Sequence, residues 1–199
     1  MKKYLAILTV AVVSIVLTPS PTQADTTPPT VMVYGDSITS HYNNTTGDPM
    51  RGWWSWTAAD MGMNPVLSAE GGSGFTRKGL GTPEGATCSG TRFYNRREYV
   101  TDWHPNVLLV EGGRNDINIC NSNGTLRAST DAEVTRDVHA CFIEMAHRAD
   151  DLWGSGHRAN VYVLVPWGTA SATRSSAIRS IIKSEAEDRG FDYIPVAKF

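Results

Sequence analysis

The sequence predicts an α/β fold in which a five-stranded parallel sheet forms the middle layer of a three-layer α/β/α sandwich. Two observations predict this class. Five short apolar segments alternate along the chain with longer segments of helical periodicity, which is the pattern of strands joined by crossover helices. Three of the apolar segments also run directly into glycine-containing turns, as parallel strands do at the carboxyl edge of a sheet. Connections of this kind place helices on both faces of one sheet.

The first predicted strand, residues 30–34, is a run of β-branched and apolar residues that ends at Gly35. Glycine has no Cβ and lets the backbone turn sharply after the strand. The other predicted strands follow in chain order and complete a parallel, flavodoxin-like sheet: residues 65–68, 106–110, 160–165 and 191–196.

Three helices are predicted between these strands. Residues 50–61 form the first, which ends at Gly62 and carries Trp53, Trp54 and Trp56, of which Trp53 is expected to pack on the sheet. The second begins at a capping box of Thr130 and Glu133 and ends before Gly154. One face of it is apolar: Val134, Val138, Cys141, Phe142, Met145, Ala149 and Leu152. Residues 173–189 form the third, and Gly190 stops it.

Two connections lack such periodicity. Residues 41–48 form a polar loop after the first strand. Residues 76–102 form a long, irregular and basic segment in which four glycines are scattered. A loop this long in a compact domain is usually functional or mobile. It is either a solvated surface loop or a lid over the site that binds an anionic or sugar-rich substrate.

The amino terminus has the pattern of a secretory signal peptide, residues 1–24. Lys2 and Lys3 precede a short apolar run, prolines break that run, and small residues end at Ala24. The run is short for crossing about 30 Å of hydrocarbon, so cleavage near Ala24 and secretion are expected rather than a stable membrane span. Residues 25–29 form a flexible lead-in, and the domain occupies residues 30–199.

Export permits disulfides, and the chain has three cysteines. An odd number leaves one thiol over, and the spacing does not fit a zinc site. Cys120 lies in a loop and Cys141 on the helix after it, so these two are the expected pair, which leaves Cys88 free.

Ser37 lies just past the carboxyl end of the first strand, where open α/β sheets place their ligand crevices. A serine at that edge is a candidate nucleophile. The alternative is that it merely caps a short helix. Two later turns, residues 70–76 and 111–116, follow the second and third strands and should gather at the same edge. Backbone amides of Ser37 and Gly74 and the side-chain amide of Asn115 are the donors that an oxyanion requires.

With these motifs in place, the chain resembles the GDSL or SGNH hydrolases. The resemblance rests on Gly35-Asp36-Ser37-Ile38, on Gly71-Gly72-Ser73-Gly74 and on Gly113-Arg114-Asn115-Asp116, in that order. It implies that Ser37 is the nucleophile and that Ser37, Gly74 and Asn115 form the oxyanion hole. The matching positions Asp36, Gly113 and Asp116 are then supporting residues. The activity implied is that of a secreted serine esterase or lipase.

The resemblance also implies an Asp-x-x-His motif near the carboxyl terminus, whose histidine is the general base, and this chain has none after Asn115. The sequence stops at Phe199, directly after the fifth predicted strand. The expectation is therefore a truncated domain that lacks this motif and a closing helix. His104 and His157 precede strands, roughly 17–20 Å from Ser37 if a strand of five or six residues separates them. The other histidines are His139 and His147, which recede along a helix, and His41, four residues past Ser37.

The expected function is hydrolysis of carboxylic esters of a lipid, a glycan or a small molecule through an acyl-Ser37 intermediate, with poor turnover because the base is absent. The alternative is a non-catalytic module that binds an acylated glycan or lipid. A net charge of −2 argues against a nucleic-acid partner. No cofactor or metal is expected, because the glycine-rich turn lacks P-loop spacing and no ligand cluster is visible.

Overall fold

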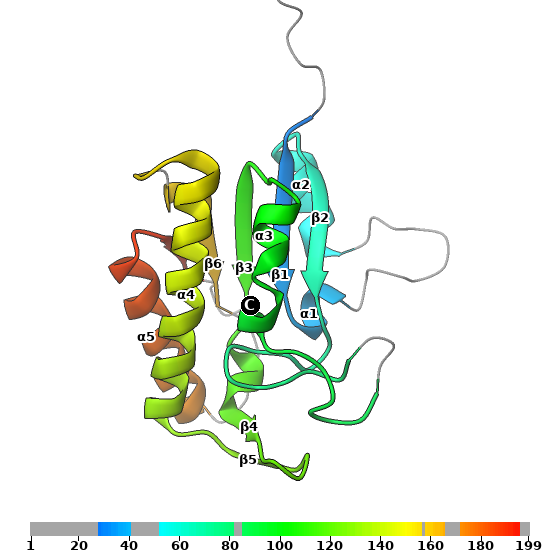
Figure 1. Cartoon of the computed structure of the whole chain (residues 1–199), viewed down its shortest axis with the longest axis vertical. Coiled ribbons are helices and arrows are strands. Elements are labelled where there is room, and N and C mark those ends of the chain that lie inside the picture. The colour runs from blue at the N-terminus through cyan, green and yellow to red at the C-terminus, as the bar shows by residue number, and fades with distance from the viewer. Residues whose placement is uncertain (1–27, 41–51, 82–84, 157, 166–171, 196–199) are drawn as a thin grey trace, which may run out of the picture.

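The five predicted strands form one parallel sheet in the order β2-β1-β3-β6-β7 (Figure 1). The structure is a computed structural model that describes residues 28–40, 52–81, 85–156, 158–165 and 172–195. Helices lie on both faces of the sheet, so the predicted α/β/α architecture is confirmed. The strands are β1 (Thr30–Gly35), β2 (Asn64–Ala69), β3 (Val107–Glu111), β6 (Val161–Leu164) and β7 (Asp192–Ile194).

Strand β1 lies in the interior of the sheet, between β2 and β3, and Val31 to Gly35 are buried. Its register aligns Gly35 with Ala69 of β2 and Tyr34 with Val110 of β3. These three strands therefore end at nearly the same level. The turns that follow them must start from one edge of the sheet, the lower edge in Figure 1.

The two faces of the sheet are covered by different helices. On one face, alternate strand residues such as Met32 and Leu108 pack with the apolar stripe of α4 (Asp131–Trp153) and with α5 (Ala172–Asp188). On the other face, Val33 and Leu109 pack with α2 (Trp53–Asp60). Alternation of side chains along each strand supplies both cores.

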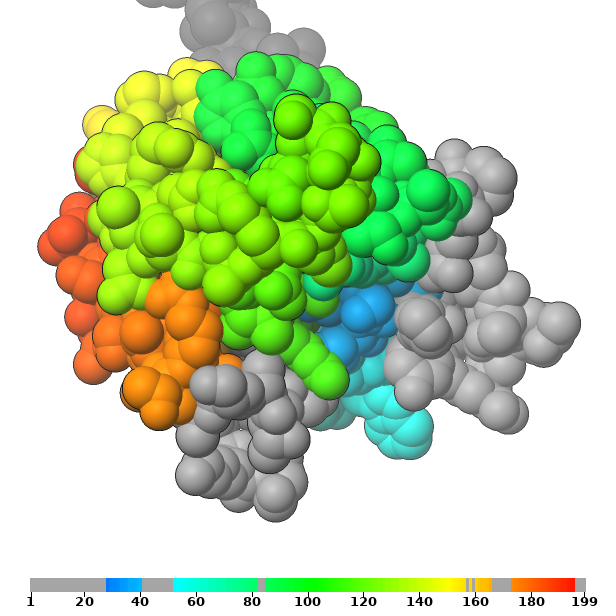
Figure 2. All heavy atoms as spheres, turned by 90° about the horizontal axis from the view of Figure 1, so that it is seen from below, coloured from blue at the N-terminus to red at the C-terminus, as the bar shows by residue number. Residues whose placement is uncertain are grey.

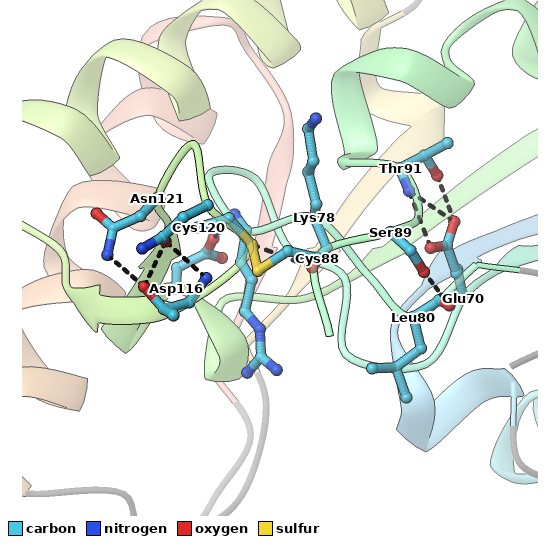
Figure 3. The surroundings of a disulfide bond; sticks show 12 residues. Glu70, Lys78, Leu80, Cys88, Ser89, Thr91, Asp116, Cys120 and Asn121 are labelled. Carbon is cyan, nitrogen blue, oxygen red and sulfur yellow. Dashed lines mark hydrogen bonds between the residues drawn. A yellow bond between two sulfur atoms is a disulfide. The ribbon is translucent and has the colours of Figure 1, made fainter. Parts of the chain in front are cut away.

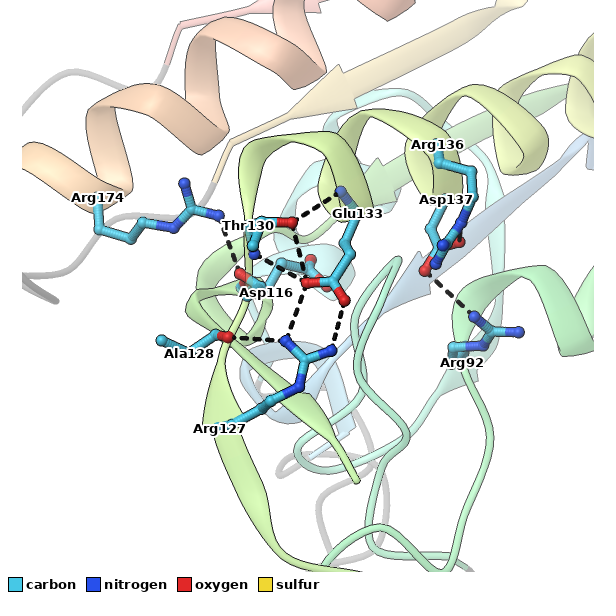
Figure 4. A network of polar contacts seen from close by, with 10 residues as sticks. Arg92, Asp116, Arg127, Ala128, Thr130, Glu133, Arg136, Asp137 and Arg174 are labelled. Atoms are coloured by element: carbon cyan, nitrogen blue, oxygen red, sulfur yellow. Dashed lines mark hydrogen bonds and ion pairs between the residues drawn. The ribbon is translucent and has the colours of Figure 1, made fainter. Parts of the chain in front are cut away.

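The start of α4 confirms the predicted capping box (Figure 4). The Thr130 hydroxyl accepts from the backbone N–H of Glu133 at 3.3 Å, and the Glu133 carboxylate accepts from the Thr130 backbone N–H at 2.9 Å. Arg127 adds an ion pair with Glu133 from the strand before the helix. The two capping-box contacts each satisfy a backbone N–H at the helix start, and the ion pair holds the Glu133 carboxylate in place.

The helix boundaries agree with the predictions to within a few residues, and the tryptophan assignment is only partly right. Helix α2 is followed by Gly62 at φ +65°, and α5 by Gly190 at φ +75°. Trp53 packs at the margin of the core, whereas Trp54 is the buried tryptophan of this helix and Trp56 is 69% exposed.

The predicted disulfide between Cys120 and Cys141 is wrong. Cys88 and Cys120 form the bond, with their Cα atoms 5.8 Å apart, and Cys141 is free (Figure 3). Cys141 lies on the apolar face of α4 with no exposed surface, so it points into the sheet and away from the loop of Cys120. Helical periodicity had already predicted that Cys141 lies on the apolar face of the helix. A cysteine on that face cannot reach Cys120, although the two are close in sequence.

The segment of residues 76–102 is more ordered than predicted. It contains the 3-10 turn η1 (Phe93–Arg96) and helix α3 (Glu98–Asp102), and Phe93 and Val100 are fully buried. Gly79, Gly81 and Gly90 pack around the Glu70 carboxylate, and a Cβ on Gly90 would lie only 1.7 Å from Oε1. The short elements α1 (Ser37–Ser40), η2 (Arg114–Ile117) and η3 (Arg158–Asn160) and the antiparallel hairpin of β4 (Asn118–Cys120) and β5 (Leu126–Ala128) were not predicted either.

Several predictions concern residues that the structure does not describe. The signal peptide, the loop of residues 41–48, His41 and His157 lie outside the described residues, and so do residues 196–199. These predictions stay predictions, and so does that of a missing closing helix. Among the described helices, none has both the length and the apolar character that a membrane crossing demands.

Candidate active site

Ser37 is the first residue of α1, the short helix that follows β1 at the carboxyl edge of the sheet. Gly35 makes the turn possible, because a Cβ there would lie 2.4 Å from Thr39 Oγ1 and 3.1 Å from Glu111 Oε2. The side chain of Ser37 is half-buried and forms no hydrogen bond with another residue in the described part of the chain. Figure 2 views this edge and shows the segment of β1 and α1, in blue, reaching the surface.

Asn115 joins the three turns that the sequence predicts to meet. Its side-chain Nδ2 donates to Asp36 Oδ2 at 3.0 Å and to the Ser73 carbonyl at 2.9 Å. Asp36 immediately precedes Ser37, and Ser73 immediately precedes Gly74. Gly113 precedes η2 at φ 114°, a left-handed conformation that glycine adopts readily. The turns after β1, β2 and β3 are therefore held together by one carboxamide.

Gly74 lies against the Asp116 carboxylate. A Cβ at position 74 would lie 2.5 Å from Asp116 Oδ1, so only glycine fits without a shift. Its own N–H donates to the Arg77 carbonyl at 3.0 Å. Two of the three predicted donors, the Gly74 N–H and the Asn115 amide, thus already have protein acceptors in this structure. Their assignment to an oxyanion hole stays a prediction that requires these bonds to be shared or exchanged.

Asp116 anchors the turn that follows Gly74. Its buried carboxylate accepts hydrogen bonds from the N–H groups of Phe75, Thr76 and Arg77 and from the Thr76 hydroxyl. Burial raises the pKa of Asp116, and these hydrogen bonds act in the opposite direction. The predicted supporting role of Asp116 therefore has a specific structural form, since its carboxylate shapes the glycine-rich turn.

Arg96 is a site residue that sequence reasoning missed. It comes from η1, in the segment predicted to be a surface loop or lid, and is 7% exposed. Its guanidinium donates to the Ser68 carbonyl at 2.5 Å, to the Gly35 carbonyl at 3.1 Å and to Ser73 Oγ at 3.0 Å. It therefore ties the ends of β1 and β2 to the glycine-rich turn. The sequence around it carries no signal that separates it from its exposed neighbours.

Glu111 is a second missed residue, although it begins the third motif. It is the last residue of β3 and has no exposed surface. Its Oε2 accepts from the Thr39 hydroxyl at 3.2 Å and, more weakly, from the Asp36 N–H at 3.4 Å. A glutamate that ends an otherwise apolar buried strand is a sequence signal that could have found it.

The electrostatics of the site are dominated by buried carboxyl groups. Burial raises the pKa of Asp36 to about 6, and hydrogen bonds to Ile38 and Glu111 oppose the shift. Burial likewise raises the pKa of Glu111 well above its usual range. Burial lowers the pKa of Arg96, which is itself nearly enclosed. The described residues include no group of three or more His, Cys, Asp and Glu side chains arranged to hold a metal ion.

Three histidines lie within the described residues, and none is hydrogen-bonded to Ser37. His139, on α4, contacts Glu185 of α5 at 2.8 Å, and His104 and His147 are exposed. A general base must come within about 3 Å of the proton that it removes. The described part of the chain therefore supplies a serine and candidate oxyanion donors without a histidine base beside them.

The fold of this chain resembles those of solved esterases. No protein-family model matches the chain, and no curated protein matches it. A family two carbohydrate esterase from Clostridium thermocellum, solved with cellohexaose, aligns at a TM-score of 0.58 and 16% identity, over 89% of this chain and 57% of that chain. AlinE4, an SGNH-hydrolase family esterase, aligns at 0.54 and 15% identity, over 84% of this chain and 75% of that one.

A further carbohydrate esterase, whose active site is described as having divergent catalytic and non-catalytic binding functions, aligns at a TM-score of 0.54 and 14% identity. The alignment covers 86% of this chain and 60% of that one, so the chain spans less than two thirds of both carbohydrate esterases. At these identities the likeness concerns the fold. The fold is that of the SGNH-hydrolase esterases, as the sequence motifs predicted.

Proposed function

We propose that the protein is an esterase that hydrolyses carboxylic esters through an acyl-Ser37 intermediate. The observation that carries the proposal is the Asn115 carboxamide, which bridges Asp36 and Ser73 and so brings the three motif turns together next to Ser37. Fold likeness to esterases supports the same reaction class. Acetylated glycans, lipids and small acyl esters are all carboxylic esters that this reaction could use as substrates.

The proposed reaction uses Ser37 and the candidate oxyanion donors, together with a general base that the described residues do not supply. Ser37 Oγ attacks the ester carbonyl carbon and loses its proton to a base. The carbonyl oxygen becomes an oxyanion, which the N–H groups of Ser37 and Gly74 and the Asn115 amide are of the right type to stabilise. The intermediate expels the alcohol, which takes up a proton, and leaves the acyl group on Oγ. Water then releases the acid and restores the serine.

The expected turnover is low, because no described histidine is hydrogen-bonded to Ser37 as a general base. In a well-studied serine hydrolase, loss of the base costs about 10⁶ in turnover, and about 10³–10⁴ over water survives from oxyanion binding. A fluorophosphonate, whose covalent label accumulates on the serine even when the reaction is slow, is therefore a better first probe than an ester assay. It reports one covalent event for each protein molecule and needs no turnover.

The test is labelling by a fluorophosphonate in the wild type, in Ser37→Ala and in Ser40→Ala. Ser40 is a matched control, since it lies on the same short helix, where its N–H bonds to the Asp36 carbonyl at 2.9 Å. We expect label in the wild type and in Ser40→Ala but none in Ser37→Ala. Absence of label from the wild type, or equal label in Ser37→Ala, rejects the proposal.

A second candidate is a non-catalytic module that binds acylated glycan or lipid. It is favoured by one observation, that the Gly74 N–H and the Asn115 amide are already bonded to protein acceptors. The solved carbohydrate esterase with divergent catalytic and non-catalytic functions is consistent with such a role. This candidate requires that the wild type and Ser37→Ala bind an acetylated oligosaccharide equally and hydrolyse it equally slowly.

We propose further that the protein is exported and that residues 1–24 are removed. The support is the charge and apolar pattern of those residues, together with the bond between Cys88 and Cys120, which persists best in an oxidising compartment. Mass spectrometry of the secreted protein should give a chain that begins at Asp25. A chain that retains Met1 in the cell rejects this proposal.

A further inference from the structure

The reaction proposed above gives no role to the buried carboxyl group of Glu111. Its side chain has no exposed surface and is enclosed by protein. Oε2 accepts from Thr39 and Asp36, but Oε1 has no hydrogen-bond partner among the described residues, although it too is buried. An ionised carboxylate left in this position would have one oxygen neither hydrated nor bonded, which is costly.

The nearest acidic group is Asp36, whose side chain also has no exposed surface. Its Oδ1 accepts from the Ile38 N–H at 2.8 Å and its Oδ2 from Asn115 Nδ2 at 3.0 Å. The Asp36 backbone N–H donates to Glu111 Oε2 at 3.4 Å, so the two buried carboxyl groups are neighbours, and each affects the pKa of the other. Two ionised carboxylates repel each other and present only acceptors, so a hydrogen bond between these two groups requires that one of them carries a proton.

Geometry decides which carboxyl holds the proton. Asp36 has a donor on each oxygen, at 2.8 and 3.0 Å, and such contacts favour the ionised form. Glu111 has only the longer contacts, both on Oε2, and a proton turns its bare Oε1 into a donor. Other groups that act on the pair come from several elements: Thr39 of α1, Asn115, Arg114 and Asp116 of η2, Arg96 of η1 and Arg77 of the glycine-rich turn.

We propose that Glu111 is a positioning residue whose protonated carboxyl donates to the Asp36 carboxylate and so holds both the Asn115 amide and the turn that carries Ser37. The protonation and the positioning rest on the burial and the contacts of Glu111 and Asp36, and only the effect on catalysis rests on the proposed function. No bond to substrate is involved, since Glu111 acts through Asp36. Its location at the end of β3 explains how one strand can set the geometry of the turn after β1.

Two matched variants separate the parts of this proposal. Glu111→Gln keeps the shape and an N–H donor but cannot ionise. Glu111→Met fills a similar volume and provides no donor. Both remove the titration of position 111, and only the first preserves the hydrogen bond to Asp36.

The first measurement is the unfolding free energy of the wild type and Glu111→Gln across pH 5 to 8. The unfolded Glu111 ionises near pH 4.3, whereas burial keeps the folded group protonated to a higher pH. In that window the unfolded state binds fewer protons than the fold, so wild-type stability falls as pH rises. We expect the unfolding equilibrium constant of the wild type to rise, relative to Glu111→Gln, by up to about tenfold per pH unit, or about 1.36 kcal/mol, at pH values between the unfolded and the folded pKa of Glu111.

The second measurement is the side-chain amide resonance of Asn115, which reports its position without any enzyme activity. We expect it to be unchanged in Glu111→Gln and displaced in Glu111→Met. A third is the rate of Ser37 labelling by the fluorophosphonate. Loss of a hydrogen bond to a charged group should slow it about 10- to 100-fold in Glu111→Met, with less than a threefold change in Glu111→Gln.

A stability difference between the wild type and Glu111→Gln that stays constant with pH would overturn the protonation. An Asn115 resonance that moves equally in both variants would overturn the positioning role, whether or not Ser37 reacts. If the wild type is not labelled at all, the proposed function fails, while the first two measurements still decide this inference. Because the first measurement needs only Glu111→Gln and the wild type to fold, failure of Glu111→Met to fold leaves the pH test decisive.

Discussion

Replacing Arg96 by methionine tests whether one buried cation assembles the site. Methionine keeps the length and much of the volume of the side chain but removes every donor. The lost contacts are those to the carbonyls of Ser68 and Gly35 and to Ser73 Oγ. The guanidinium also lies 4.8 Å from the ring centroid of Tyr34 and 5.1 Å from that of Phe93, so cation–π contacts are lost too.

The expected loss of stability follows from the contacts that the substitution removes. Gly35 O still accepts from the Glu70 N–H at 3.2 Å, and the Ser73 hydroxyl still donates to the Glu70 carbonyl at 2.8 Å. Ser68 O loses its 2.5 Å bond from the guanidinium, and loss of a hydrogen bond to a charged group costs about 1.5–3 kcal/mol. Cation–π contacts in a desolvated setting add about 2 kcal/mol. Methionine avoids the cost of burying a charge, so a net destabilisation of about 3 kcal/mol is expected.

The assay is thermal unfolding followed by circular dichroism. For a domain of this size about 1 kcal/mol corresponds to 2–4 °C, so Arg96→Met should lower Tm by about 6–12 °C. Fluorophosphonate labelling of the folded variant should also slow, because the ends of β1 and β2 are no longer tied to the glycine-rich turn.

The matched control is Arg97→Met, one residue further along the chain. The Arg97 side chain is 26% exposed and forms ion pairs with Glu98 at 3.4 Å and Glu144 at 3.6 Å. Such partly exposed pairs contribute about 0–1 kcal/mol, so a Tm change below about 4 °C is expected. Equal Tm values for the two variants would refute the reasoning that Arg96 organises the site.

Three further changes test the turns and the thiols. Gly74→Ala places a Cβ against the Asp116 carboxylate and should destabilise the fold by about 1–3 kcal/mol in urea unfolding; a neutral result would contradict the close approach. Asp116→Asn replaces an acceptor by a donor facing backbone N–H groups and should cost about 2–4 kcal/mol in the same assay, whereas wild-type stability would show that those amides find other acceptors. A thiol reagent should find no reactive thiol in the native protein and one, Cys141, after unfolding without reductant. Peptide mapping that links Cys120 to Cys141 instead of Cys88 would contradict the observed disulfide.

Much of the fold could be predicted because it depends on local patterns. A buried parallel strand must be apolar on both faces, and β1 shows this directly in its sequence. Gly62 and Gly190, at φ +65° and +75°, follow the ends of α2 and α5, because glycine adopts a positive φ without a steric penalty. This preference is local and needs no tertiary context. The hairpin of β4 and β5 escaped prediction, since strands of three half-buried or exposed residues carry no alternation to detect.

The candidate site also has a part that the sequence predicts and a part that it does not. Ser37, Gly74 and Asn115 could be singled out since each follows a predicted strand, and parallel strands deliver their ends to one edge. The contacts that hold that edge together could not be predicted. Arg96 is buried and Arg97 is not, and this difference depends on where η1 packs against the sheet. The sequence of this arginine-rich segment does not indicate which arginine is buried.

The sequence by itself determined the class of fold, the order of its elements and the edge at which the motifs meet, because periodicity and glycine placement are properties of neighbouring residues. Only the tertiary structure decided which groups touch at that edge. The pairing of Cys88 with Cys120, the burial of Arg96 and the contact of Glu111 with Asp36 join residues 32 or more positions apart. Burial and partner choice at such separations are set by how the packed elements exclude water, which no local pattern records.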